Sequence, residues 1–439
     1  MQKNSLIERD LRHIWHPCSQ MKDYQSFKPL EVIAANHAHL HLKDGRKIID
    51  AISSWWCKSL GHNHPRLKQA LHQQIEKFEH VILANTTNET IVQLSEKLAG
   101  LTSSLNKVLY ASDGSCAVEM AMKMSLHARM IQGEEQRTKF IALENAYHGE
   151  TTGALSVSDM GLYRAPYRSM LFNADFISHL PYVSNIKDEL WNDAEKHWEK
   201  IIHQLEPLSS VATAVIVEPV VQGAAGVKIH SQDFLRRLRL WTKKHGIHLI
   251  ADEIMTGIGR TGKMLACEYA DVEPDFLCLS KGLTSGWLPL SAMLTTQSIY
   301  DLFYDDYAAG KSFLHSHTHS GNVLAASVAV EVINIVQEEG LCARAMELGQ
   351  VMHAHMQNIA METKKLTNVR WIGGIVAADL VCDQPGRRYG YEIYKRATEL
   401  GVLLRPLGNT VYWLPPLNVE WSVLDVIRDV TVAAIRDVG

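Results

Sequence analysis

The stretch HLIADEIMTGIGRTGKMLACEYADVEPDFLCLSK, residues 248–281, contains two short apolar runs that each end at a charged residue. The first run, 248–251, leads to Asp252, and the second, 276–280, leads to Lys281. Short apolar runs bounded by turn signals are typical of strands that are buried on both faces of a sheet. We therefore expect Asp252 and Lys281 to lie at the ends of two such strands.

The same pattern continues on both sides of this stretch. Further apolar runs lie at residues 107–111, 139–143, 214–217 and 290–295. Helical apolar periodicity accompanies them at 65–78, directly after Ser115, and from 323 to about 336. This alternation predicts an α/β fold in which a mostly parallel sheet carries helices on both faces. Ligands of such sheets bind outside the carboxyl ends of the strands.

Both ends of the chain depart from this rhythm. Residues 44–46, with the sequence DGR, form a hairpin signal between two short strand candidates near the N-terminus. The C-terminal part mixes helices with strand candidates at 370–380, 402–404 and 410–414. We therefore expect a large domain at 61–338 and a smaller α+β domain built from 1–60 and 339–439.

Composition limits the classes of protein to consider. The 439 residues carry a formal net charge of −4, which offers no basic surface for nucleic acid. The longest apolar stretch, 211–221, is interrupted by Glu218 and Pro219 and is too short to span a bilayer. The first ten residues lack the apolar core of a secretory signal. Seven cysteines without a C-x-x-C pair fit reduced thiols, so we expect a cytoplasmic protein that binds neither nucleic acid nor membranes.

A third polar feature follows a strand end. The turn SDGS, residues 112–115, lies between the strand candidate at 107–111 and a helix. Parallel strands bring their carboxyl ends to one edge of a sheet, so this turn should meet Asp252 and Lys281 there. Each feature alone has an ordinary explanation, as a turn, a helix cap or a surface lysine. Their joint placement is what points to a shared ligand.

The three features together suit pyridoxal 5'-phosphate. A lysine amine that burial keeps partly unprotonated can bond covalently to the aldehyde carbon of that cofactor. A carboxylate beside the pyridine nitrogen keeps the nitrogen protonated, so that the ring can take up electrons from the substrate. A Gly/Ser turn at a helix N-terminus offers N–H groups and a hydroxyl to the phosphate. The sequence therefore predicts a cofactor site formed by Lys281, Asp252 and the SDGS turn.

Over nearly its whole length the sequence resembles the class III aminotransferases, which have fold type I of the pyridoxal-phosphate enzymes. The shared blocks are WHP (15–17), SSWW (53–56), GHNHP (61–65), SDGS (112–115), AYHGE (146–150), EPVVQG (218–223), ADEI (251–254), GRTGK (259–263), SKGL (280–283) and LRP (404–406). ADEI and SKGL mark the family in general, whereas WHP and SSWW are more specific. The resemblance implies an enzyme that moves amino groups with pyridoxal 5'-phosphate.

The resemblance also implies a role for each matching residue at the cofactor. Lys281 binds the cofactor covalently and carries the proton between substrate and cofactor. Asp252 pairs with the pyridine nitrogen, and Tyr147 stacks on the ring. These three are the expected catalytic residues, and Gly114 and Ser115 are expected to bind the phosphate.

The implied substrate-binding residues are Trp55, Trp56, Tyr147, Arg260, Lys281, Ser316 and Arg405. Trp55 lines the substrate channel, and Arg405 receives a substrate carboxylate through two charge-assisted hydrogen bonds. Ser316, His317 and Thr318 match the segment that family members lend to the phosphate site of the neighbouring subunit. That match implies an obligate homodimer with active sites at the subunit interface.

The specific blocks imply transfer of an amino group from S-adenosylmethionine to 8-amino-7-oxononanoate, which yields 7,8-diaminononanoate for biotin synthesis. Two departures touch the active site. Cys18 stands where tyrosine is usual, and Ser316 and His317 precede Thr318 where Gly-Pro is common. These departures leave lysine open as the amino donor. WHP and SSWW argue against an ω-amino-acid or diamine aminotransferase, and the lack of a basic segment argues against a non-catalytic regulator.

Two other patterns have simpler explanations. Residues 257–262 spell G-x-G-x-x-G, a nucleotide motif, but Met264 stands where a magnesium-binding hydroxyl belongs. We expect a flexible loop near the active site there instead, with Arg260 close to the donor. Alternating histidines at 37, 39 and 41, and at 315, 317 and 319, could bind zinc. The first trio fits the wet side of a hairpin and the second the phosphate segment, so we expect no metal.

Overall fold

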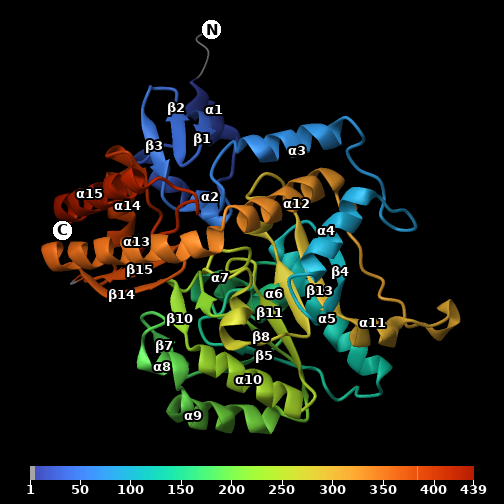
Figure 1. The fold of residues 1–439 in the computed structure, drawn as a ribbon. Coiled ribbons are helices and arrows are strands. Elements are labelled where there is room, and N and C mark those ends of the chain that lie inside the picture. The colour runs from blue at the N-terminus through green and yellow to red at the C-terminus, as the bar shows by residue number, and fades with distance from the viewer. Residues whose placement is uncertain (1–4, 383) are drawn as a thin grey trace.

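The computed structural model describes residues 5–382 and 384–439. Its centre is a seven-stranded sheet with the order β4-β13-β12-β11-β8-β5-β6 (Figure 1). The strands are β4 (Leu105–Ala111), β5 (Lys139–Leu143), β6 (Asp175–Ile177), β8 (Ala212–Val217), β11 (His248–Asp252), β12 (Phe276–Leu279) and β13 (Ser291–Thr296). The strands from β12 to β6 are parallel, and β13 runs against both of its neighbours. The predicted α/β fold is confirmed.

Helices cover both faces of this sheet, because successive residues of a buried strand point to opposite sides. In β8, Val215 and Val217 pack in one cluster with Phe234 of helix α10 (Gln232–Lys244). Their neighbours Ala214 and Ile216 pack with helix α5 (Gly114–Ile131) on the other face. The cover is completed by α3 (Pro65–Ile75), α4 (Glu89–Ala99), α9 (Glu195–Leu205) and α12 (Val323–Glu338). The predicted helices are therefore present, with small shifts at their ends.

The reversed strand β13 does not separate the functional turns. Because β4 and β12 both run antiparallel to β13, they run parallel to each other. The carboxyl ends of β4, β11 and β12 therefore share one edge of the sheet. The SDGS turn, Asp252 and Lys281 lie at those ends.

Two smaller sheets, β1-β2-β3-β16 and β14-β15-β17, lie beside the large one. Their strands are β1 (Val32–Asn36), β2 (His39–Leu42), β3 (Lys47–Asp50), β14 (Leu366–Ile372), β15 (Ile375–Leu380), β16 (Val402–Leu403) and β17 (Thr410–Trp413). The accompanying helices are α13 (Leu341–Thr363), α14 (Tyr389–Glu399) and α15 (Trp421–Val438). β3 and β16 pair in parallel, so strands from the two ends of the chain lie side by side (Figure 1). On this basis we propose domain limits near residues 60 and 339.

The remaining elements are short. The helices are α1 (Leu6–His13), α2 (Ser53–Trp56), α6 (Thr152–Ser156), α7 (Gly161–Arg164), α8 (Glu189–Asn192) and α11 (Gln297–Phe303), and the strands are β7 (Tyr182–Val183), β9 (Val221–Gln222) and β10 (Lys228–His230). The 3-10 helices are η1 (Met21–Gln25), η2 (Ala165–Met170), η3 (Glu206–Leu208), η4 (Ala266–Ala270), η5 (Lys281–Thr284) and η6 (Tyr307–Ala309). Within the described residues, no helix has the length and apolar character that crossing a membrane requires.

Glu253, directly after β11, makes the stability of the fold depend on pH. Its side chain is buried and accepts hydrogen bonds from the N–H groups of Ala266 and Cys267. Burial raises the pKa of Glu253 to about 7, from the ordinary value of 4.5. The folded protein therefore keeps a proton that the unfolded chain releases above pH 4.5. This contribution to stability is complete below pH 4.5 and is lost as the pH rises through 7.

We expect Glu253→Gln, which cannot ionise, to remove this part of the pH dependence. Relative to the parent protein, the free energy of unfolding of the variant should rise by about 3 kcal/mol between about pH 4.5 and about pH 7. Replacing one carboxyl oxygen with an amide NH2 also removes a hydrogen-bond acceptor, which changes the free energy of unfolding by an amount that does not depend on pH. Thermal unfolding across this range measures the difference, and Glu135→Gln, an exposed position, is the control. A difference as flat as that of the control contradicts the raised pKa.

Candidate active site

A cavity of about 630 Å³ opens at the carboxyl edge of the large sheet. Its walls come from the ends of β4, β11 and β12, from α2, and from the loop around 284–290. The residues singled out from the sequence that line it are Trp55, Trp56, Gly114, Ser115, Tyr147, Asp252 and Lys281. Arg260, Ser316, His317, Thr318 and Arg405 do not line the cavity, although Arg405 stacks on Trp55, which does.

Lys281 is held in an unusual backbone conformation directly after β12. Its φ is 42°, in the left-handed region that residues with a side chain rarely adopt. Its Nζ atom lies 4.6 Å from the centre of the Trp56 ring. Removal from water lowers the pKa of the Lys281 amine, and the Asp252 and Glu218 carboxylates offset only part of that effect. A larger share of the amine is therefore neutral, which is the form that attacks an aldehyde carbon.

Asp252, at the end of β11, is buried and oriented by two hydrogen bonds. Its Oδ1 accepts from the N–H of Ile254 at 3.1 Å, and its Oδ2 lies 2.8 Å from Nδ1 of His148. Nε2 of His148 is buried and has no partner among the described residues. The histidine thus holds the Asp252 carboxylate in one orientation at the cavity wall.

A second buried carboxyl group, Glu218, lies at the same wall. It accepts from the N–H of Tyr147 at 2.9 Å and from the N–H of Gly223 at 3.0 Å. Burial raises the pKa of Glu218 to about 7, although the field of His148 acts in the opposite direction. The Glu218 carboxyl group thus fixes the backbone of Tyr147.

The SDGS turn forms a cradle at the N-terminus of α5. Asp113 caps the helix by accepting from the N–H of Cys116 at 3.1 Å. Among the described residues, the N–H groups of Gly114 and Ser115 make no hydrogen bond, so they are available to an anion. A Cβ atom on Gly114 would lie 2.8 Å from the Ile254 side chain, which explains the glycine at this close approach. The cradle fits a phosphate group.

Tyr147 forms a side wall of the cavity. Its hydroxyl donates to Oε1 of Glu150 at 3.0 Å, and its ring meets the Tyr163 ring edge-on, with centres 6.3 Å apart. Burial and the Glu150 carboxylate raise the pKa of Tyr147, so the hydroxyl stays protonated. An aromatic face with a protonated polar tip fits stacking on a flat heterocycle.

Two tryptophans form a further part of the wall, and an arginine packs against one of them. Trp56 is buried, and its Nε1 donates to the hydroxyl of Tyr412 at 2.9 Å. Trp55 is 40% exposed, and the guanidinium of Arg405 lies 4.1 Å from the centre of its ring. Arg405 also donates to the backbone carbonyl of Cys18 at 2.9 Å. An apolar wall that ends in a guanidinium suits a substrate with a long chain and a terminal carboxylate.

The loop 257–262 differs from the flexible segment expected near the site. Most of its residues are buried, and Arg260 donates to the carbonyl of Pro415 at 2.8 Å. Gly259 and Gly262 take positive φ angles of 86° and 94°, which lets the loop fold tightly against the C-terminal part of the chain. Arg260 therefore lies outside the cavity, and its expected contact with the donor is not supported.

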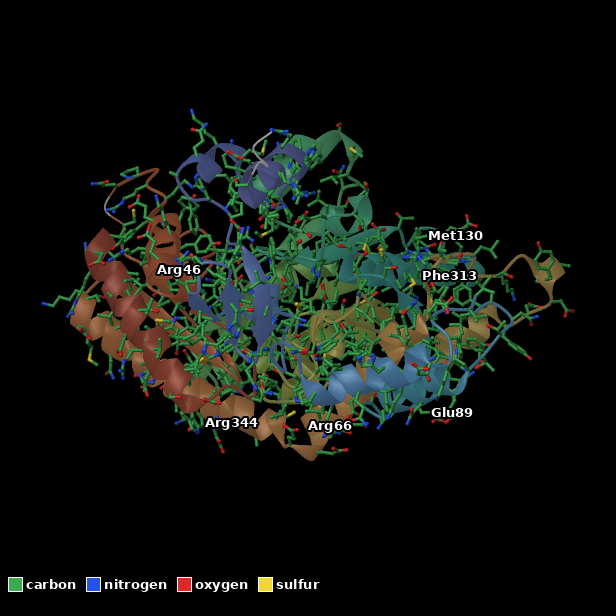
Figure 2. All side chains as sticks on the ribbon, turned by 90° about the horizontal axis from the view of Figure 1, so that it is seen from above. Arg46, Arg66, Glu89, Met130, Phe313 and Arg344 are labelled. Atoms are coloured by element: carbon green, nitrogen blue, oxygen red, sulfur yellow. The ribbon has the colours of Figure 1, made fainter. Side chains whose placement is uncertain are left out.

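The segment 313–318 lies apart from the cavity of its own chain. Phe313 lies near Met130, at the end of the molecule opposite Arg46 (Figure 2). The carbonyl of Thr318 lies 3.0 Å from Nε2 of His80. Across the described residues, no group of three or more His, Cys, Asp or Glu side chains is placed to hold a metal ion.

The loop around 284–290 is a functional segment that the sequence patterns did not single out. It lines the cavity, and Lys58 holds it by donating to the carbonyl of Gly286 at 2.9 Å. It connects Lys281 to β13, whose first residue lies at the carboxyl edge because that strand is reversed. A reversed strand after the lysine is thus the signal that could have found this loop.

Comparison with known proteins gives consistent matches along the chain. The family model described as aminotransferase class-III matches residues 21–435. A Helicobacter pylori protein named adenosylmethionine-8-amino-7-oxononanoate aminotransferase is 38% identical over 94% of this chain and 94% of its own. The protein of that name from Aquifex aeolicus is 36% identical over 99% and 97%. The solved structure of the protein of that name from Methanocaldococcus jannaschii has a TM-score of 0.92 at 31% identity and covers 99% of both chains. An amine transaminase from an uncultivated Pseudomonas species, solved in a PLP-bound form, has a TM-score of 0.89 at 31% identity over 97% and 99%.

Proposed function

The chain belongs to the class-III aminotransferase family, and we propose on that basis that it transfers an amino group from S-adenosylmethionine to 8-amino-7-oxononanoate. The product is 7,8-diaminononanoate, an intermediate of biotin synthesis, and the cofactor is pyridoxal 5'-phosphate. The observation that carries the proposal is the single cavity lined by Lys281, Asp252, Gly114 and Ser115. The names of relatives that match almost the full length support the choice of substrates.

The cofactor fits the cavity through groups that the structure leaves available. The N–H groups of Gly114 and Ser115 would hold its phosphate, Asp252 would pair with its ring nitrogen, and Tyr147 would supply an aromatic face for its ring. When bound, pyridoxal 5'-phosphate supplies an electron-poor ring that stabilises negative charge on the substrate carbon that bears the amino group. The hydrogen bond from His148 keeps the Asp252 carboxylate directed at one place during this charge shift.

Lys281 has two tasks in the proposed mechanism. As a neutral amine it is the group that would hold the cofactor covalently through the aldehyde carbon, with loss of water. The same amine, at the cavity wall, would also serve as the base that accepts the proton from the donor carbon and gives it back. Its lowered pKa suits both tasks, because a fully protonated ammonium could neither bond nor accept a proton.

The acceptor is a long aliphatic chain that ends in a carboxylate. Trp55, Trp56 and Tyr147 supply apolar surface along the cavity, and the guanidinium of Arg405 binds the carboxylate. Arg405 is held by the ring of Trp55 and the carbonyl of Cys18. When 8-amino-7-oxononanoate binds, the guanidinium therefore exchanges its hydrogen bond to the neutral carbonyl of Cys18 for hydrogen bonds to the charged carboxylate.

We expect Arg405→Ala to raise the KM for 8-amino-7-oxononanoate by roughly 10- to 100-fold, the value of a hydrogen-bonded charged contact. The kcat should change less, because the guanidinium does not touch the reacting carbon. Steady-state kinetics with varied acceptor measure the effect. Arg428→Ala, which removes an arginine on α15, is the control and should leave the KM unchanged. The methyl ester of the acceptor should bind equally to parent and Arg405→Ala proteins, and a large difference for the ester contradicts the carboxylate contact.

A half-reaction identifies the amino donor. S-adenosylmethionine, lysine, ornithine and β-alanine are added one at a time to the yellow holoenzyme, and the cofactor absorbance is followed. The proposal expects a spectral change with S-adenosylmethionine and its reversal when 8-amino-7-oxononanoate is added. A change with lysine alone would replace the donor, which the unusual Cys18 leaves open. A change with any donor but no reversal by 8-amino-7-oxononanoate contradicts the proposed acceptor.

The assembly we propose is a homodimer in which Ser316, His317 and Thr318 complete the phosphate site of the other subunit. Support comes from the finding that they do not line the cavity of their own chain, and from the position of nearby Phe313 at the outer end of the molecule (Figure 2). If Lys281→Ala and Thr318→Ala chains are co-expressed, half of the dimers are mixed, and each mixed dimer holds one site with both native residues. We expect about a quarter of the parent activity, far above either variant alone. Activity equal to the mean of the two variants contradicts the shared site.

A cytoplasmic location completes the proposal. All seven cysteines are free thiols, including exposed Cys18 beside the cavity. Free thiols at such positions are typical of proteins from a reducing compartment. Fractionation of cells that carry a tagged copy tests this location.

A further inference from the structure

Residues 53–56, which form α2, carry four consecutive positive φ angles. The values are 50° at Ser53, 44° at Ser54, 71° at Trp55 and 73° at Trp56. In this left-handed region Cβ crowds the following carbonyl oxygen, so residues other than glycine enter it rarely and as single residues. A run of four, in which two tryptophans line the cavity, has to be held by contacts from outside the run.

Asp50, at the end of β3, supplies those contacts from a fully buried position. Its Oδ1 accepts from the N–H of Ile52 at 3.3 Å and from the N–H of Ser54 at 3.0 Å. Its Oδ2 accepts from the hydroxyl of Ser54 at 2.6 Å and lies 2.9 Å from Nε2 of His62. Burial acts to raise the pKa of Asp50, but the hydrogen bonds from His62 and Ser54 outweigh it and lower the pKa. The carboxylate therefore stays ionised and keeps all four contacts.

Both sides of this arrangement are anchored to other parts of the chain. The N–H of His62 donates to the carbonyl of His37 at 2.7 Å, and the N–H of His37 donates back at 3.0 Å. Gly61 has a φ of 73°, and a Cβ atom there would lie 2.7 Å from the His37 carbonyl oxygen, so this bridge requires glycine. On the other side, the hydroxyl of Ser53 donates to the carbonyl of Leu414 at 2.7 Å. Three separate segments thus fix the run.

The run places one aromatic ring against each of the two cationic groups of the site. The Trp56 ring lies 4.6 Å from Nζ of Lys281, and the Trp55 ring lies 4.1 Å from the guanidinium of Arg405. A right-handed backbone at either tryptophan would turn its side chain in another direction. The left-handed run is therefore what keeps both rings in contact with both cations.

We propose that Asp50 and His62 are positioning residues, which hold this run left-handed and so fix the spacing between the reacting amine and the carboxylate-binding guanidinium. That spacing determines which acceptor chain length fits the cavity. The consequence for substrate binding rests on the proposed function, whereas the restraint on the run does not. Neither residue touches the substrate, since both act through Trp55 and Trp56.

The test first removes the Asp50 carboxylate that restrains the run. It then places at position 54 a glycine, which adopts positive φ angles without such a restraint. In the holoenzyme, Asp50→Asn is expected to raise the KM for 8-amino-7-oxononanoate about tenfold, with a smaller change in kcat. Glycine enters the left-handed region without strain, so adding Ser54→Gly should lower this KM again by roughly 5- to 30-fold relative to adding Ser54→Ala. The two additions remove the same hydroxyl and differ only in Cβ. In Asp50→Asn, the KM values for shorter and longer homologues of 8-amino-7-oxononanoate should rise less than the KM for 8-amino-7-oxononanoate itself.

The order of thermal stability provides a readout that needs no substrate. At Ser54 the glycine variant should melt above the alanine variant by about 2 °C, both in the parent protein and in Asp50→Asn. Ser95, in the right-handed helix α4, also bonds through its hydroxyl and is the matched control. There the order should be reversed, because glycine weakens an ordinary helix. If Asp50→Asn does not fold, the two Ser54 single variants still give the comparison.

Each outcome is decisive for one part of the inference. Alanine above glycine at Ser54, as at Ser95, overturns the restraint on the run. The expected melting order with an unchanged KM in Asp50→Asn overturns the positioning role. A protein with the expected melting order and no turnover of 8-amino-7-oxononanoate refutes the proposed function and leaves the restraint supported.

Discussion

Lys281→Ala should lower the rate of amino transfer by at least roughly 10³-fold, since one amine supplies both the covalent bond and the proton transfer. The cavity remains formed, because Lys281 holds no other segment and the SDGS cradle, Asp252 and Tyr147 keep their own contacts. The cofactor should therefore still bind, although borohydride would no longer fix it to the protein. Single-turnover kinetics and mass spectrometry after borohydride treatment measure the two effects.

Lys263→Ala is the matched control for this prediction. Lys263 lies over the Tyr269 ring at 5.9 Å and occupies the lysine position of the nucleotide-like motif. We expect it to keep nearly the full rate, and a small added amine should restore part of the rate to Lys281→Ala. Full activity in Lys281→Ala, or loss of activity in Lys263→Ala with ATP binding in the parent protein, would refute the assignment of the lysine.

Asp252→Asn is expected to lower kcat by roughly 10²- to 10³-fold while leaving the fold intact. The amide has the size of the carboxylate, but it carries no charge to keep the ring nitrogen protonated, so the ring takes up electrons less readily. The donor half-reaction should slow as much as the full reaction, because both need the same electron uptake. Stopped-flow absorbance of the cofactor measures this rate.

Asp159→Asn is the control for Asp252→Asn. It shows whether a lower kcat comes from the lost charge beside the cofactor ring or from the loss of any carboxylate near the site. Oδ2 of Asp159 accepts from the N–H of Asn145 at 2.9 Å, and the residue is exposed beside the site. Asp159→Asn should stay within about threefold of the parent rate. If Asp252→Asn also stays within that range, Asp252 does not control the charge on the ring.

Much of the fold and the centre of the site follow from local patterns in the sequence. The apolar runs at 248–251 and 276–280 form buried strands because helices cover both faces of the sheet. Such strands have no solvent-exposed face, so their sequences show no alternation of polar and apolar residues. The position of Asp252 and Lys281 at strand ends then brings them to one edge. The reversal of β13, which the sequence patterns did not predict, does not affect this result. β13 is antiparallel to both β12 and β4, so β4 and β12 still run in the same direction.

Other parts of the site depend on contacts between distant segments. Arg260 sits in a motif that is typical of flexible loops, yet the carbonyl of Pro415 binds its guanidinium and buries it. The left-handed run at 53–56 contains no glycine, the residue that usually indicates positive φ angles, so its backbone conformation could not be predicted from the sequence. It exists because Asp50 and the His37–His62 bridge hold it, and no local propensity reports such a restraint.

The hydrogen bond from Ser53 to Leu414 joins residues that are 361 positions apart in the chain. During synthesis at about 5–20 residues per second, the first partner therefore waits roughly 20–70 s at the ribosome before the second exists. The strand β3, which precedes Ser53, lacks its partner β16 for nearly all of that interval. The substrate wall is therefore complete only after β17 has been synthesised, and a premature stop codon anywhere before β17 yields a polypeptide that lacks part of this wall.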